Sequence, residues 1–118
     1  MRLVFADERV HRLSADSTHA AAFWGTRWTT LMFCMALLLD SVDFASLRAW
    51  QALDIRITAG LVHVAHHDAV VTLVPLTPDG TALEIHEGEA VNNLDTVNAA
   101  QVIDVACAGK HAATPRSR

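Results

Sequence analysis

The longest uncharged apolar run of the chain covers residues 28–39, WTTLMFCMALLL. These 12 residues are too few to cross a bilayer, which takes about 20 apolar residues. In and around the run, apolar side chains recur at spacings of three and four, the pattern of one helix face. We therefore predict a buried helix, under a sheet or in a dimer interface, with a strand over residues 29–39 as the alternative. The recurring residues are Trp24, Trp28, Leu31, Met35, Leu38 and Val42.

These six residues are the predicted interface of the protein. Hydrophobic residues make up 52% of the 118-residue chain, and in so small a domain surplus apolar side chains commonly end in a subunit interface or a membrane. The sequence contains no phosphate-binding Gly-rich loop and no nucleophile elbow. The favoured hypothesis is a non-catalytic binding or assembly module that buries the stripe in a homo-oligomer or in a complex with a protein partner.

A protein anchored in a membrane by residues 20–39 is a further hypothesis. Such a span would place Arg27 inside the bilayer, at a cost of at least about 2.5 kcal/mol. Cys34 and Cys107 have no paired metal-ligand spacing, so reduced, cytoplasmic conditions are the default expectation. Cys34 is expected to be a buried thiol, and a bridge to Cys107 stays open.

The charge distribution argues against a nucleic-acid partner. The net charge is −4, and no Lys or Arg occurs between Arg56 and Lys110, where seven carboxylates fall. A nucleic-acid surface needs Lys and Arg to replace the counterions of the phosphates. We therefore expect no nucleic acid among the partners.

The two halves of the chain have different patterns. A short strand over Arg2–Phe5, a polar turn, a helix from about Thr18 and a second helix capped by Asp43 are predicted first. From residue 54 onward, β-branched runs alternate with turn sequences. The runs are DIRIT, LVHVAH, AVVTLVPL, ALEIH and QVIDVA.

This pattern predicts an α+β domain, with one or two apolar N-terminal helices packed on a C-terminal antiparallel β-meander or small barrel. Pro75 is expected at an edge, a bulge or a strand end, because proline cannot donate to the ladder. The domain is predicted to span residues 1–109, and residues 110–118 are predicted to form a flexible tail.

Histidines in the predicted strands form the candidate metal site. If the segment LVHVAHH is extended, His63 and His67 point to one face, and Glu84 and His86 share a face in the same way. Two histidines on one strand face hold a divalent metal when neighbouring strands supply further ligands. A small metal-binding barrel or metal-dependent enzyme using these four residues is the alternative function. The competing interpretation is a solvated hairpin bend at residues 66–68 and a wet sheet face at Glu84 and His86.

Two family resemblances support the metal hypothesis. The segment TPDGTALEIHEG, residues 77–88, looks like the closing segment of the vicinal oxygen chelate family of glyoxalases and dioxygenases. This resemblance implies that residues 78–80 form the turn before a strand and that Glu84 binds the metal. ADSTHAAAFWGTRW, residues 15–28, is similar to the helix that follows the first strand of that family. GLVHVAHHD, residues 60–68, resembles the first motif of cupins, with His66-His67 in place of His-x-His.

Overall fold

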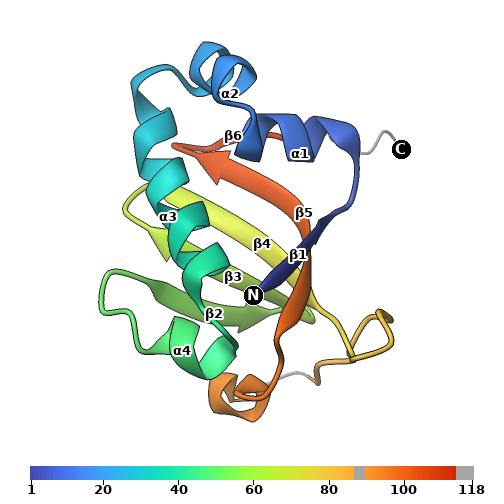
Figure 1. Ribbon diagram of the computed structural model, residues 1–118. Helices are drawn as coiled ribbons and strands as arrows, with labels where there is room; N and C mark the ends of the chain where they lie inside the picture. Colours follow the sequence, from blue (N-terminus) through green and yellow to red (C-terminus); the bar gives the residue numbers. More distant parts are fainter. Residues whose placement is uncertain (87–89, 114–118) are drawn as a thin grey trace.

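One strand and four helices come before the run of strands that fills the second half of the chain (Figure 1). The computed structural model describes residues 1–86 and 90–113. The first part consists of β1 (Arg2–Phe5), α1 (Glu8–Ala15), α2 (Ser17–Trp24), the 3-10 turn η1 (Gly25–Arg27), α3 (Trp28–Asp40) and α4 (Phe44–Arg48). The second part consists of β2 (Asp54–Thr58), β3 (Leu61–His66), β4 (Ala69–Pro75), the 3-10 turn η2 (Val91–Leu94), β5 (Ala99–Cys107) and β6 (Lys110–His111).

The six strands form one mixed sheet with the order β1-β5-β4-β3-β2, and β6 pairs with β5. Strands β2 to β5 form an antiparallel meander, whereas β1 is parallel to β5. The sheet is open, with β1 and β2 at its two edges. The predicted α+β class and the antiparallel meander are therefore confirmed, and the sheet does not close into the barrel that was the alternative.

Short turns set the register of the meander. Ala59 and Gly60, with φ of 52° and 76°, make the left-handed pair that suits the twist of a two-residue hairpin. His67, with φ of 53°, and Asp68 form the next turn, so the histidine-rich stretch does bend here. Pro75 is the last residue of β4, where its missing N–H group costs the ladder least.

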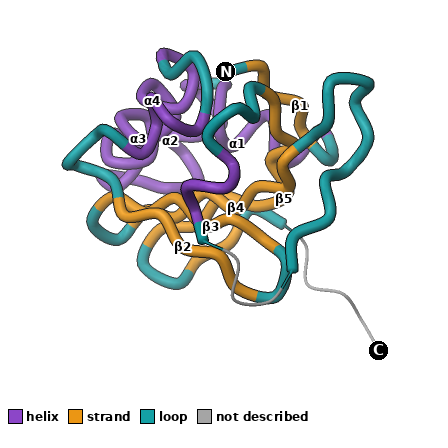
Figure 2. The backbone as a smooth tube through the Cα atoms, turned by 90° about the horizontal axis from the view of Figure 1, so that it is seen from below, coloured by secondary structure: helices purple, strands orange, loops and turns teal. Residues whose placement is uncertain are grey.

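All four helices lie on one face of the sheet, and the described residues place no helix on the other face (Figure 2). Helix α1 packs on β5 and β1, and α3 packs on β3, β4 and β5. Alternation along the strands directs one set of side chains to the helices. The fully buried residues of this set include Val62, Val64, Val71, Leu73, Val102 and Val105.

Helix α1 occupies a segment for which the sequence predicted a polar turn. The side chain of Asp7 accepts a hydrogen bond of 2.8 Å from the N–H of Val10, which satisfies one of the free donors of the first turn. Val10 and Leu13 are buried on the inner side of the helix. The residues between them are exposed. Only two apolar residues therefore mark the inner face of this helix, too few for a clear helical periodicity in the sequence.

The second half differs from expectation in one strand and at its end. Only an isolated bridge, between Leu76 and Ala82, follows the turn at residues 77–81, and residues 83–86 are not a strand. At the other boundary, Lys110 and His111 pair with β5, and Ala112 is fully buried. Sheet structure therefore continues into the tail predicted at residues 110–118, and residues 114–118 of that tail lie outside the described residues.

We expect Leu38→Ala to lower the free energy of unfolding by about 2–5 kcal/mol, because Leu38 is fully buried between α3 and the sheet. The adjacent Leu39 is 57% exposed, so Leu39→Ala should change it by less than about 0.5 kcal/mol. Urea denaturation of dilute protein measures both values. Equal costs for the two leucines would show that α3 does not pack on the sheet in this orientation.

Candidate functional site

The predicted metal ligands on β3 and its turn lie in different settings. His63 lies on the helix-free face of the sheet, where its Nδ1 is 3.2 Å from the hydroxyl of Thr72 on β4. His67 is exposed in the hairpin bend, with its ring 4.4 Å from the ring of His66. His66 points to the helix face, where its ring contacts Phe33 of α3 at 4.6 Å. The helix-face position of His66 agrees with the predicted alternation of the strand.

Glu84 and His86 are exposed and lie on no strand, so the expectation that they share a strand face is wrong. The reason is the topology: β3 already pairs with one edge of β4, and β5 pairs with the other edge as far as Pro75. A strand over residues 82–86 has no free edge of β4 to join. No three His, Cys, Asp or Glu residues within 1–86 and 90–113 come together to hold a metal ion.

The Pro-Asp-Gly turn exists, but it is stabilised by local hydrogen bonds. The carboxylate of Asp79 accepts hydrogen bonds from the hydroxyls of Thr77 and Thr81 and from the N–H of Thr81. These hydrogen bonds hold the pKa of Asp79 below its usual range, and the bond from the Thr77 hydroxyl has the largest effect. The turn thus has a structural reason for its residues that involves no metal.

An Asp-His pair on the helix-free face was not predicted from the sequence. Asp104 of β5 pairs in register with Thr72, and its carboxylate accepts hydrogen bonds from Nδ1 of His111 at 2.6 Å and from the N–H of Ala113 at 2.8 Å. The Asp104 side chain is only 18% exposed. This carboxylate holds the last strand against β5. The polar Asp104 among the apolar residues of QVIDVA could have indicated a role for this side chain. Its partners His111 and Ala113, however, lie in the segment that was predicted to be a flexible tail.

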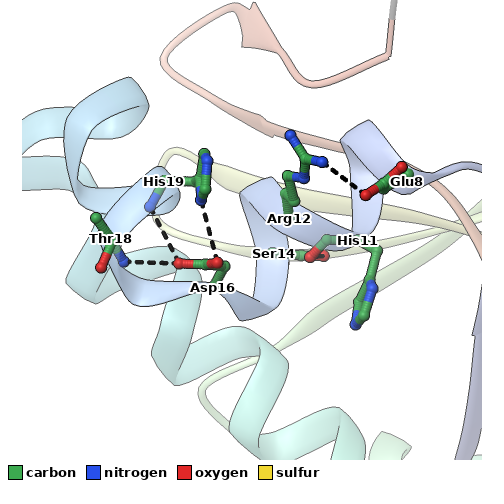
Figure 3. A network of polar contacts seen from close by, with 7 residues as sticks. All are labelled: Glu8, His11, Arg12, Ser14, Asp16, Thr18 and His19. Atoms are coloured by element: carbon green, nitrogen blue, oxygen red, sulfur yellow. Dashed lines mark hydrogen bonds and ion pairs between the residues drawn. The ribbon is translucent and has the colours of Figure 1, made fainter.

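A second group of polar contacts lies in α1 and at the start of α2 (Figure 3). Glu8 and Arg12 form an ion pair one turn apart along α1. Asp16 caps α2 by accepting from the N–H groups of Thr18 and His19, and the bond from His19 is the largest cause of its lowered pKa. A pocket of about 300 Å³ beside this corner is lined by Glu8, Arg9, Arg12, Leu13 and His19. Its Arg12 and His19 already have carboxylate partners, so these side chains are accounted for by an ion pair within α1 and by the capping of α2.

The cysteines are free thiols on the helix side of the sheet. Burial raises the pKa of Cys34 from 9.0 to about 12, with a smaller contribution from Cys107. Burial also raises the pKa of Cys107, against the opposing effect of Arg27. A thiol must ionise to act as a nucleophile, and burial opposes the ionisation of both cysteines.

The predicted interface stripe packs mainly against the chain's own sheet. Trp24, Leu31, Met35 and Leu38 are buried, and Trp28 is half-buried against the same core. Val42 differs, since it is 73% exposed. Four of the six stripe residues are therefore already covered within the chain, and apolar surface for a partner has to be sought elsewhere.

Segment Ser17–Asp40 is long and apolar enough to cross a membrane by length and composition. In the structure, Gly25, with φ of 64°, ends α2, and a 3-10 turn separates it from α3. Transfer of α3 to a bilayer would uncover the apolar face of β3, β4 and β5. The anchor hypothesis therefore requires a conformation different from this compact one.

An apolar groove lies beside the free edge of β1. Its volume is about 330 Å³, and it opens on the helix side of the sheet. Strand β1 pairs only with β5, so its outer edge has no strand partner in the described part of the chain. The groove is lined by Leu3, Phe5, Ser14, Ala15, Met32, Met35, Ala36 and Leu39. We call the outer edge of β1 together with this groove the β1-edge surface.

Exposed apolar side chains gather around the start of β1. The amino group of Met1 donates to the carbonyls of Leu39 and Ser41, which holds β1 against the end of α3. Trp50 donates from its indole to the hydroxyl of Ser41 at 3.1 Å. Of the five large hydrophobic residues that are exposed in the described part of the chain, four belong to this region, namely Val4, Leu39, Val42 and Trp50. The β1-edge surface is therefore the candidate functional site.

Comparison of this chain with protein-family models, with curated proteins and with solved structures finds no match.

The Asp104 carboxylate should control the docking of β6. We expect Asp104→Ala to destabilise the protein by about 1–3 kcal/mol, because it removes two hydrogen bonds to one largely buried carboxylate, and to speed amide exchange at Ala113. Asp79→Ala, which removes a carboxylate from a local turn, is the matched control. Unchanged exchange at Ala113 in Asp104→Ala would contradict the assigned role.

The thiol of Cys34 should stay unreactive in native protein. Because burial raises its pKa to about 12, the thiol remains protonated as the solution passes about pH 8.5, where an ordinary cysteine ionises. Alkylation by iodoacetamide should therefore hardly accelerate between about pH 7 and about pH 9 in native protein, and should accelerate in guanidinium chloride. Rapid native alkylation of Cys34, located by peptide mass spectrometry, would show that the site opens.

Proposed function

We propose that this protein is a non-catalytic binding or assembly module, and that it binds its partner through the β1-edge surface. The observation that carries the proposal is the coincidence of a free strand edge with an apolar groove. The strand edge offers backbone hydrogen bonds, and the groove offers pockets for apolar side chains. This combination is the one used when a partner adds a strand to a sheet.

The composition of β1 supports the same proposal. Natural sheets protect their edge strands with charged side chains, Pro, bulges or a covering segment. Strand β1 has a single charged residue, Arg2 at its start, and no Pro, and its pairing with β5 shows no register shift. The opposite edge differs, since β2 carries the ion pair Asp54–Arg56 and η2 packs beside it. Of the two edges, β1 is the one that remains suited to a partner.

The half-buried apolar groove also accounts for part of the hydrophobic surplus of the sequence. Exposed apolar surface contacting water is unfavourable by about 25 cal/mol per Å², so a partner that covers Leu39 and Val4 gains stability. These side chains are 57% and 44% exposed. Isolated exposed apolar residues are common on protein surfaces, but a cluster around an open edge is typical of an interaction site.

Site-specific photo-crosslinking tests the proposal. A photoreactive amino acid in place of Val4 should give covalent adducts in cells that express the chain, because Val4 lies on the proposed surface. The matched control is Thr58, an exposed residue of the other edge strand, where we expect no adduct of the same mass. Absence of adducts at Val4 at every expression level, with the variant folded, would overturn the proposed function.

A further inference from the structure

We propose that the partner at the β1-edge surface is a second copy of this chain, joined by antiparallel pairing of the two β1 strands about a two-fold axis. The inference rests on the proposed function, because it names the partner of the same surface. In the resulting dimer the sheets of the two copies form one continuous sheet. Each copy supplies the same edge and the same groove, as an isologous interface requires.

The backbone of β1 defines the register of this pairing. The N–H groups of Arg2 and Ala6 donate to the carbonyls of Asn98 and Val102, on the β5 side. Because N–H and C=O groups alternate in direction along a parallel strand, those of Leu3 and Phe5 point to the free edge. Antiparallel pairing of Leu3 with Phe5 of the second copy satisfies all of these outward groups at once. Registers centred on Leu3 or on Phe5 leave half of them unpaired.

The charges around β1 favour the antiparallel orientation. Arg2 lies at the start of the strand, and Asp7 and Glu8 follow its end. Pairing centred on Val4 places Arg2 opposite Ala6 of the second copy, next to the carboxylates that follow. Arg2 has no ion-pair partner within the chain as far as residues 1–86 and 90–113 show. Parallel pairing would instead bring the two arginines together.

The side chains suit the same register. Val4 meets Val4 of the second copy on the helix-free face as a non-hydrogen-bonded pair, in which the Cα atoms lie about 4.5 Å apart. On the other face, Leu3 meets Phe5 of the second copy, and the two grooves approach each other across the axis. Leu39 and Met32 line each groove, so apolar surface covers apolar surface on both faces of the new strand pair.

Disulfide trapping with Val4→Cys tests both the partner and the register. The expected Cα separation at the axis falls within the range of about 4.4–6.8 Å that a disulfide spans. Mild oxidation should therefore link Val4→Cys into a covalent dimer, seen by non-reducing electrophoresis. The matched control is Arg2→Cys, which lies opposite Ala6 in this register and should not link. The native cysteines are buried and contribute little to the reaction.

Two measurements on folded protein support the trapping experiment. Sedimentation velocity of the wild-type chain should show a concentration-dependent dimer, and amide exchange at Leu3 and Phe5 should slow as that dimer forms. Val4→Asp places like charges opposite each other and should weaken the dimer by roughly fivefold or more. Circular dichroism confirms that the variant is folded.

The outcomes separate this inference from the proposed function. A wild-type chain that stays monomeric, with fast exchange at Leu3 and Phe5 and no preferential linking of Val4→Cys over Arg2→Cys, overturns the dimer. If photo-crosslinking at Val4 still yields adducts with a mass other than twice that of the chain, the binding function stands with a different partner. If it yields no adducts, both proposals fail.

Discussion

The packing of α3 on β3, β4 and β5 is the interaction on which the remaining structure depends. Leu31, Cys34 and Leu38 are completely buried there, so the helix and the strands remove each other's apolar surface from water. Between β1 and β2 the chain runs through the helices that cover one face of the sheet, and these two strands lie at opposite edges. The same packing that forms the core thus leaves the edge of β1 open beside the exposed flank of α3.

The central place of β4 has the opposite effect on the metal hypothesis. With both edges of β4 paired, residues 82–86 leave the sheet after one isolated bridge. Glu84 and His86 consequently lose the strand face that they were expected to share, and His63 instead faces Thr72. The predicted ligand set needed particular strands to be neighbours, and the order of the strands does not bring its residues together.

Local patterns predicted several elements well because short-range chemistry defines them. Strand β1 has the predicted bounds, β2 and β3 match their β-branched runs, and Asp43 caps α4 as expected by accepting from the N–H of Ser46 at 2.9 Å. Helix α1 was missed because only Val10 and Leu13 mark its inner side, among charged residues typical of a turn. The pair Asp104–His111 was missed because it joins a strand to a segment that has no periodicity of its own.

Side-chain patterns in the sequence were enough to define the α+β class, most of the strands and turns, and the burial of one face of the helix formed by residues 28–39, whereas Phe33 and Leu39 of that run are exposed. These properties follow from side-chain periodicity and turn chemistry, which act over a few residues. Only the tertiary structure decided that the stripe including Leu31 and Leu38 faces the chain's own sheet, and that β5 lies between β1 and β4. Strand order and the choice of covered face depend on contacts between distant segments, because one apolar pattern satisfies a core and an interface equally well.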